Sequence, residues 1–376
     1  MIARLSRRRA VGWFGAALVA AASRRATGAD SSAKRPSLKA LAAMKGMRFG
    51  SAVSDHRTGS FNDPNYARLL DADCALLVAE NELKWQAIRP APDRFDFDAF
   101  DRILAQANAR GMAMRGHNLL WHRPQWLPKW LEQHEFGPAP AAEAERILTT
   151  HIRTVCRRYR GQIHGYDVVN ETVLPEDGTL AQTVLSRAIG GTEPLLDLAF
   201  HVAREEAGGS QLVYNDYMSW EPGNEKHRDG VLRLLEGFRR RGTPVDALGV
   251  QSHLRPAGPP QEAAWRRFID DVLGMGYGIL VTEFDVNDQD LPADPVARDQ
   301  AVADAGRAYL ELMFSYRQLK DVLVWGMCDS ASWLQGFKPL RIDGRAKRPC
   351  LYDAAFQPKP LWDAVARSFA AAPART

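Results

Sequence analysis

The sequence predicts a single (β/α)8 TIM barrel, which belongs to the α/β class, and three observations support this. From about residue 45 onward, short apolar runs alternate with longer stretches that have the apolar spacing of helices, as in a parallel sheet covered by helices. Eight such units can be counted. Nearly every strand-like run ends in polar or aromatic side chains, and this fold carries its functional residues at the carboxyl ends of its strands. A doubly wound nucleotide-binding sheet is disfavoured because residues 50–54 lack a glycine-rich turn.

The elements can be assigned in order along the chain. The predicted strands are 46–51, 75–79, 112–118, 165–170, 211–215, 247–251, 278–283 and 321–325. The helices predicted between and after them include 97–109, 141–159, 194–206, 225–241, 261–275, 295–316 and 360–370. Eight units with somewhat long loops occupy the length of one barrel, so the 376 residues leave no room for a second domain.

The two ends of the chain are predicted to lie outside the barrel. Residues 1–29 begin with basic residues, continue with an apolar run too short to span a membrane, and end with small residues, as in an export signal. The run Ser6-Arg7-Arg8-Arg9 resembles a twin-arginine signal. We therefore expect a signal peptide at 1–29, a mature N-terminal segment at 30–44, the catalytic barrel at 45–370 and a tail at 371–376. The mature protein would have no membrane span and would be periplasmic or secreted.

Composition excludes several other classes of protein. A content of 45% hydrophobic and 25% charged residues excludes disorder. The formal net charge is +4, but residues 1–29 contain six arginines and no acid, so the mature chain carries about −2 and no nucleic-acid partner is expected. Four scattered cysteines are too few for a disulfide scaffold or a zinc ribbon. Cys328 and Cys350 could pair in an oxidising compartment, which the sequence leaves open.

Two glutamates, Glu171 and Glu283, end the fourth and seventh strands, which lie across the barrel from each other. Paired carboxyl groups are the residues needed to cleave an acetal, one protonating the leaving oxygen and the other attacking the anomeric carbon. His253 and Asp285 are placed to orient Glu283 and keep it ionised, which leaves Glu171 as the acid. Asn170 is placed to bond the hydroxyl group on C2 of the sugar.

Further strand-end side chains fit the binding of a sugar, whose apolar faces stack on indoles and whose hydroxyl groups need hydrogen-bonding partners. The candidates are Trp121, Trp325 and Trp333 for stacking, and Glu80, Asn81, Lys84, His117 and Gln251 for the hydroxyl groups. Trp265 and Trp362 fall within helical patterns and are predicted to pack in the core. Trp126 and Trp130 fit either role.

Seven of these motifs, in this order, resemble glycoside hydrolase family 10 over about residues 45–369. They are Glu80-Asn81-Glu82-Leu83-Lys84-Trp85, Arg115-Gly116-His117-Asn118-Leu119-Leu120-Trp121-His122, Asp167-Val168-Val169-Asn170-Glu171, Tyr214-Asn215-Asp216-Tyr217, Gly249-Val250-Gln251-Ser252-His253, Thr282-Glu283-Phe284-Asp285, and Trp325-Gly326 with Asp329 and Ser332-Trp333. The resemblance implies a retaining endo-β-1,4-xylanase acting on xylan or xylo-oligosaccharides, with Glu171 as acid/base and Glu283 as nucleophile. It implies no cofactor and no catalytic metal, and we expect a monomer.

The resemblance also assigns the remaining candidates. It places Glu80, Asn81, Lys84, His117, Trp121, Gln251, Trp325 and Trp333 on the glycone side of the cleft and Asn170 at the sugar next to the cleaved bond, with His253 and Asp285 orienting the nucleophile. Four positions depart from the family pattern. Leu83 replaces Met, Tyr166 replaces Trp, Met218 replaces Asn, and Arg123-Pro124 replaces the Ser-Gln that usually follows Trp121-His122.

Three alternatives remain at the level of sequence. Within the same chemistry, a β-1,4-glucanase or an aryl-glycosidase would differ only in clearance for a small group. A metal-dependent barrel hydrolase could use His117, His122 and His253 with strand-end carboxylates. A non-catalytic carbohydrate-binding barrel would be indicated by loss of Glu171 or Glu283, and both residues are present.

Overall fold

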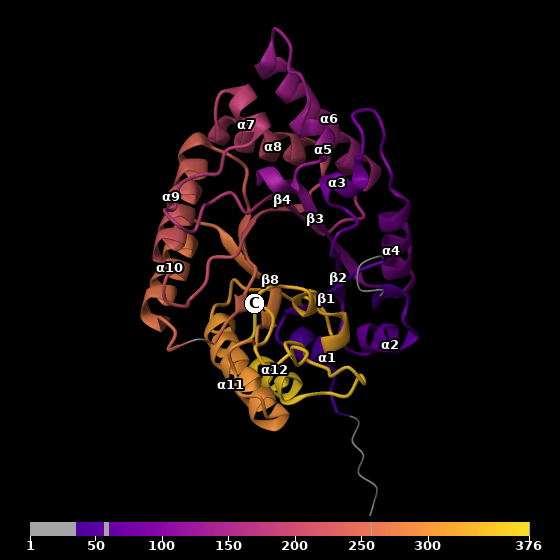
Figure 1. Ribbon diagram of the computed structural model, residues 1–376, viewed down its shortest axis with the longest axis vertical. Helices are drawn as coiled ribbons and strands as arrows, with labels where there is room; N and C mark the ends of the chain where they lie inside the picture. Colours follow the sequence, from indigo (N-terminus) through magenta and orange to yellow (C-terminus); the bar gives the residue numbers. More distant parts are fainter. Residues whose placement is uncertain (1–34, 56–59, 257, 376) are drawn as a thin grey trace, which may run out of the picture. The chain divides into compact units, whose positions relative to one another are not determined.

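The computed structural model describes residues 35–55, 60–256 and 258–375, which form a closed parallel β-barrel surrounded by helices (Figure 1). The predicted export signal at 1–29 lies outside the described residues. The strands are β1 Arg48–Val53, β2 Leu76–Ala79, β3 Ala113–Trp121, β4 Gly165–Asn170, β5 Gln211–Asp216, β6 Ala247–Val250, β7 His253–Leu254, β8 Gly278–Val286 and β9 Asp321–Val324. The predicted (β/α)8 barrel is confirmed.

Every strand pairing in the barrel is parallel. The hydrogen-bonded order runs from β6 back through β5, β4, β3, β2 and β1 to β9 and β8, and β6 pairs with β8 to close the ring. The two-residue β7 continues β6 past Ser252, whose φ is +65°, and pairs with β8 at His253–Asp285. Because all eight main strands point the same way, their carboxyl ends meet at one mouth.

Twelve α-helices lie in the described part of the chain, and most of them cover the outside of the barrel (Figure 1). They are α1 Leu38–Ala43, α2 Pro64–Asp73, α3 Trp85–Ile88, α4 Asp98–Ala109, α5 Lys129–Glu132, α6 Pro140–Arg158, α7 Val184–Ile189, α8 Thr192–Glu206, α9 Glu225–Arg241, α10 Glu262–Gly274, α11 Pro295–Phe314 and α12 Pro360–Ala371. Their ends follow local chemistry. For example, α11 begins with Pro295 behind Asp294, whose carboxylate caps the backbone N–H of Ala297.

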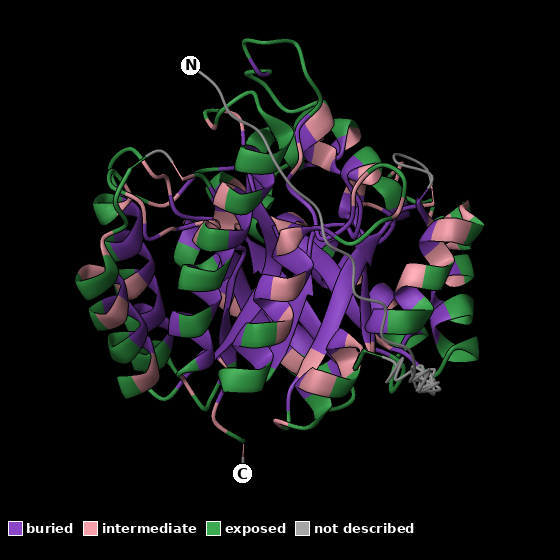
Figure 2. Ribbon diagram, turned by 90° about the horizontal axis from the view of Figure 1, so that it is seen from below, coloured by how far each residue is buried: buried purple, intermediate pink, exposed green. Residues whose placement is uncertain are grey.

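The main core lies between the strands and the helices. In Figure 2 the strands are buried, whereas the helices alternate buried inner faces with exposed outer ones. Along β2, Leu77 and Ala79 belong to this core, while Leu76 and Val78 pack inside the barrel with Trp325. This two-residue alternation is the one expected of a strand buried on both faces.

Segment 30–44 contributes to this fold where the structure describes it. Helix α1 buries Leu38 and Ala42 in the main core, and the Leu38 N–H donates to Asp73 over 2.9 Å. The packed unit therefore begins ahead of residue 45. Trp265 and Trp362 are buried, and Trp265 lies wholly within the core, as predicted. All four cysteines are buried and unpaired.

Candidate active site

A β-bulge aims Glu283 into the barrel mouth. Along β8, Leu280 packs inside the barrel, whereas Val281 and Phe284 both belong to the outer core, so strict alternation is broken between them. The pairing of β8 with β9 shifts register over the same residues. The extra residue turns Glu283 inward, where its carboxylate accepts a hydrogen bond from Asn215 Nδ2.

Glu283 is held in its ionised form by its neighbours. It is only 5% exposed, and its two oxygens accept hydrogen bonds from Asn215 Nδ2 at 2.8 Å and His253 Nε2 at 3.2 Å. Burial by itself would raise the pKa of this carboxyl group. The hydrogen bond from His253 and the positive charges of His117, His253 and Lys84 outweigh burial and hold the pKa below its ordinary value.

His253 carries a proton because it lies between two carboxylates. Its Nδ1 bonds Asp285 Oδ1 at 2.9 Å and its Nε2 bonds Glu283. Burial opposes the charged imidazolium, but the two carboxylates, Asp285 foremost, raise the pKa of His253 to about 10. The second oxygen of Asp285 accepts from Trp333 Nε1 at 2.8 Å, which fixes both the carboxylate and the indole. His253 and Asp285 thus lie where the sequence placed them, beside Glu283.

Glu171 has the opposite electrostatic environment. It follows β4 with a left-handed φ of +55°, and its carboxyl oxygens accept from Trp121 Nε1 and Gln251 Nε2, both at 2.9 Å. Burial is the largest influence and raises its pKa. The hydrogen bonds from Trp121 and Gln251 lower the pKa, whereas the negative charges of Asp216 and Glu283 raise it further. The net pKa of Glu171 lies above its ordinary value. Glu171 can therefore hold a proton at a pH at which Glu283 is ionised.

Asn215 connects the two glutamates and was not among the predicted site residues. Its Nδ2 donates to Glu283 and also to Asn170 Oδ1 at 2.8 Å, and its Oδ1 accepts from Thr282 at 2.7 Å. The backbone N–H of Glu171 donates to the carbonyl of Asn215. The run Tyr214-Asn215-Asp216-Tyr217 marked this strand end in the sequence, but it did not distinguish Asn215 from its neighbours.

The predicted sugar-binding residues surround this pair. Lys84 Nζ donates to Asn81 Oδ1 at 3.2 Å and lies 4.5 Å from the ring centre of Trp121. His117 Nδ1 forms a hydrogen bond with Asp167 Oδ2 at 3.0 Å. The His117 ring lies edge-on to Trp325, with 5.3 Å between the ring centres.

The other predicted sugar-binding side chains lie at the same mouth. Gln251 Nε2 lies 3.5 Å from Asn170 Oδ1, and Trp333 lies 5.0 Å from the His253 ring. Glu80 is buried directly after β2. The mouth that holds Glu171 and Glu283 thus combines indole rings, amides and charged groups.

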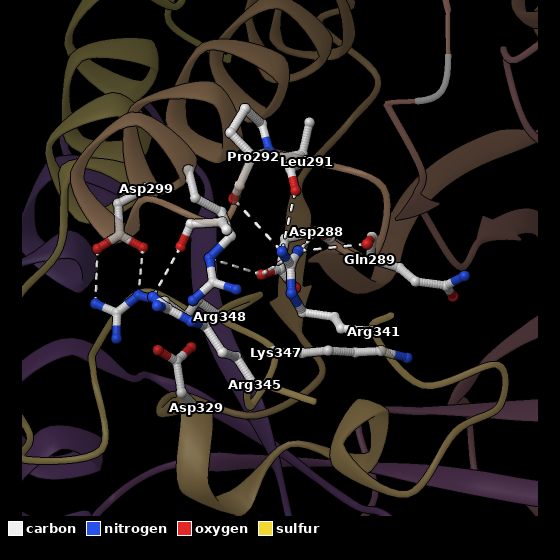
Figure 3. Close-up of polar contacts among 12 residues, drawn as sticks. Asp288, Gln289, Leu291, Pro292, Asp299, Asp329, Arg341, Arg345, Lys347 and Arg348 are labelled. Atoms are coloured by element: carbon white, nitrogen blue, oxygen red, sulfur yellow. Dashed lines mark hydrogen bonds and ion pairs between the residues drawn. The ribbon is translucent and has the colours of Figure 1, made fainter. Parts of the chain in front are cut away.

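A buried network of charges ties the loop after β8 to the loop after β9 (Figure 3). Arg341, from the later loop, donates to the backbone carbonyls of Asp288, Gln289 and Leu291 in the earlier one. The wholly buried Asp288 carboxylate faces Arg341 and also lies 3.3 Å from Arg298. The network holds together the loops that follow Asp285 and Trp333.

Three of the four departures from the family pattern lie away from the cleft. Leu83, Tyr166 and Met218 are each at most 1% exposed and belong to the main core. The fourth, at Arg123-Pro124, lies in the turn after β3, where Trp126 stacks on Trp121. Trp130 is half-buried, and its N–H donates to the carbonyl of Arg89.

The histidines of the metal-site alternative have separate partners. His122 is buried against Thr183, and burial lowers its pKa to about 3, whereas His117 and His253 bond carboxylates. Among the residues described, no cluster of three or more histidine, cysteine or acidic side chains is arranged to hold a metal. None of the described helices has the length and apolar character needed to cross a membrane.

Comparison with known proteins agrees with this geometry. Residues 37–368 match the family model described as "Glycosyl hydrolase family 10". The "Thermostable celloxylanase" of Thermoclostridium stercorarium is 32% identical over 336 residues, which are 82% of this chain and 83% of that protein. "Endo-1,4-beta-xylanase C" of Paenibacillus barcinonensis is 29% identical over 80% of this chain, which spans 29% of that longer protein. The structure of native xylanase 10B from Thermotoga maritima superposes with a TM-score of 0.79 at 26% identity, covering 89% of this chain and 98% of that one.

Proposed function

The chain belongs to glycosyl hydrolase family 10 and is a retaining endo-β-1,4-xylanase, and we propose that Glu171 is its acid/base and Glu283 its nucleophile. The observation that carries this assignment is the opposite direction of the two pKa shifts, raised for Glu171 and lowered for Glu283. Two carboxyl groups whose pKa values are separated in this way can serve as a proton donor and an ionised nucleophile at the same pH.

In the first step, the Glu283 carboxylate attacks the anomeric carbon of the xylose next to the cleaved bond, and Glu171 gives its proton to the departing oxygen. The new bond is an ester between the sugar and Glu283. In the second step, water gives a proton to Glu171 as its oxygen replaces the carboxylate at the same carbon. Asn170 is positioned by Asn215 to bond the C2 hydroxyl group, an interaction that strengthens as positive charge develops on the ring.

The test compares the mature chain with Glu283→Ala and Glu171→Ala on β-1,4-xylan, with β-1,4-glucan as a parallel substrate. We expect xylan cleavage by the parent and its loss in both variants. Glu171→Ala should retain formation of the glycosyl-enzyme from β-xylobiosyl fluoride, because fluoride departs without a proton. Equal loss on xylan and on the fluoride would contradict the acid role of Glu171.

The pH profile gives a second test. The rate should be bell-shaped, with the acidic limb set by Glu283 and the basic limb by Glu171. Asp329 is a buried carboxyl outside this pair whose pKa burial raises to about 6, so Asp329→Asn is the matched control. A basic limb in kcat/KM on xylan that moves in Asp329→Asn would contradict its assignment to Glu171.

We also propose that the chain is exported through the twin-arginine route as a monomer and works in the periplasm or outside the cell. The run Ser6-Arg7-Arg8-Arg9 and the apolar segment after it support the route. Replacing Arg8 and Arg9 by lysine should retain the protein in the cytoplasm, with a general secretory signal restoring export as the control. Export that is unchanged by the lysine pair would exclude the twin-arginine route, and sedimentation of the mature chain would test the monomer.

A further inference from the structure

Asp216 is a wholly buried carboxylate at the end of β5 to which the two-step reaction gives no task of its own. Its neighbour Asn215 turns inward to Glu283, whereas Tyr214 packs in the main core between the barrel and the helices. Because side chains alternate along a strand, Asp216 lies on the same outer side as Tyr214. With an exposed fraction of 0%, it is out of reach of a substrate in the mouth.

Three donors hold the Asp216 carboxylate. Its Oδ1 accepts from the backbone N–H of Tyr217 at 2.8 Å and from His227 Nε2 at 3.0 Å, and its Oδ2 accepts from the Tyr214 hydroxyl group. His227 belongs to the first turn of α9 and is also wholly buried, and its Nδ1 has no hydrogen-bond partner among the described residues. The hydrogen bond that the imidazole makes within the described chain therefore goes to Asp216.

This cluster supports the backbone of the acid/base. Glu171 has a left-handed φ of +55°, a conformation that a residue other than glycine keeps when its surroundings fix it. The N–H of Glu171 donates to the carbonyl of Asn215 at 2.9 Å, and the N–H of Thr172 donates to the Tyr214 hydroxyl oxygen at 3.2 Å. The same hydroxyl group donates to Asp216. Tyr214 thus links the Asp216 carboxylate to the peptide unit that joins Glu171 to Thr172.

A second link reaches the carboxyl group of Glu171. The backbone carbonyl of Asp216 accepts from the N–H of Gln251 at 3.0 Å, and the Gln251 side chain donates to Glu171 Oε1 at 2.9 Å. The negative charge of Asp216 also acts on Glu171 and raises the pKa of that carboxyl group. Asp216 is therefore connected to the backbone, the side chain and the charge state of the acid/base.

We propose that Asp216, held by His227 and Tyr214, is the positioning residue of the acid/base, which fixes the Glu171 carboxyl group for proton delivery and keeps the proton on it until the departing oxygen takes it. The inference rests on the proposed function, because it assigns Glu171 the role of acid. A positioning residue of this kind acts on proton delivery, so its loss should affect substrates that need the proton and spare those that do not.

The surrounding groups allow the effect of Asp216 to be isolated in a pH profile. Burial raises the pKa values of both Tyr214 and Tyr217, so neither phenol titrates near the basic limb. Glu283 sets the acidic limb, so a change in Glu283 would be seen there. The other titratable or charged groups that face Asp216 or Glu171 are Tyr214, Tyr217, His227, Glu283 and Arg123, which donates to the Tyr217 hydroxyl group.

Asp216→Asn removes the charge and keeps the shape. The amide oxygen can still accept from Tyr217 and His227, and the amide nitrogen can donate to the Tyr214 oxygen. The basic limb of kcat/KM on xylotetraose should move to lower pH by about 1 unit, because one of the two charges that raise the pKa of Glu171 is gone. The acidic limb should stay in place.

Tyr214→Phe removes the link to Thr172 and keeps the aromatic ring in the core. We expect kcat/KM on xylotetraose to fall about tenfold, because the acid is displaced from the departing oxygen. Formation of the glycosyl-enzyme from β-xylobiosyl fluoride should change little, since fluoride departs without a proton. His227→Leu should show the same selective loss, and His227→Gln, whose amide can donate to Asp216, should recover most of it.

Asp73 provides the matched control outside the mouth. It ends α2, is 2% exposed, and likewise accepts from a backbone N–H, a tyrosine hydroxyl group and a ring N–H. These donors are Leu38 at 2.9 Å, Tyr352 at 2.5 Å and Trp362 at 2.7 Å. Asp73→Asn should lower the Tm, as Asp216→Asn does, but leave both limbs and the ratio of rates on xylotetraose and the fluoride unchanged.

The outcomes separate the proposal from the function on which it rests. A basic limb that stays in place in Asp216→Asn, or equal loss on xylotetraose and the fluoride in Tyr214→Phe, would overturn the proposal. If Asp216→Asn does not fold, Tyr214→Phe and the two His227 variants decide the question by the ratio of rates on the two substrates. A parent enzyme that cleaves no xylan, or a Glu171→Ala variant that loses xylan and the fluoride equally, would instead overturn the proposed function.

Discussion

Replacing His253 by glutamine should move the acidic limb of the pH profile toward higher pH. The glutamine amide can still donate to Glu283, so the substitution chiefly removes the positive charge. At the observed separation of 3.2 Å and an effective dielectric constant of about 20, Coulomb's law sets a ceiling of about 5 kcal/mol on the attraction. Opposite charges at such distances typically lower a carboxyl pKa by about 1–3 units, equivalent to about 1.4–4 kcal/mol.

The assay is kcat/KM on an aryl β-xylobioside as a function of pH. Because the pKa of Glu283 is held low by His253, the limb should rise by about 1–3 pH units in His253→Gln, while the rate at pH values above the new limb changes little. Asp285→Asn removes the main cause of the raised His253 pKa and should produce a smaller shift in the same direction. An acidic limb that stays in place in His253→Gln would refute this account of how Glu283 is kept ionised.

Three further predictions follow from the same contacts. Asn215→Ala should lower kcat/KM on xylan by about 10- to 100-fold, because a hydrogen bond to the Glu283 carboxylate is lost. The midpoint of unfolding in urea should change far less. The pKa of His253 is raised to about 10 in the folded state, so its protonated form adds a few kcal/mol to the free energy of unfolding. This contribution is complete below about pH 6.5 and is lost as the pH rises to 10. The decrease in Tm over that range should therefore be smaller in His253→Gln. Arg341→Met should destabilise the fold by about 2–4 kcal/mol, measured as a lower urea midpoint at an unchanged m value, because Arg298 is then the one ion-pair partner left to the buried Asp288 carboxylate among the described residues.

The sequence predicted the barrel and which strand ends meet at its mouth, because both follow from the order of strands and helices along the chain. Alternating strands and helices permit few topologies, and parallel strands bring all their carboxyl ends to one side. Glu171 and Glu283 could therefore be placed at one mouth without coordinates. Helix α2 was not among the predicted helices, and α1 fell inside segment 30–44, since short helices carry little periodic signal.

What escaped prediction depends on local irregularity and on distances across the barrel. Strict alternation along β8 would point Glu283 away from Leu280, and only the register shift turns it inward. The bridging position of Asn215 depends on two strands that are distant in the sequence. Trp126 could not be assigned because its stack on Trp121 exists only through the 3-10 turn.

The charge on Glu283 explains how one carboxyl group can act first as an acid and then as a base. The ionised Glu283 is one of the two charges that raise the pKa of Glu171, and the other is Asp216. Once Glu283 forms its ester with the sugar, that charge disappears, so the pKa of Glu171 must fall while Asp216 stays in place. Glu171 is then poised to accept the proton of the incoming water. His253 keeps Asp285, the larger of the two causes that raise its pKa, as a charged partner through both steps.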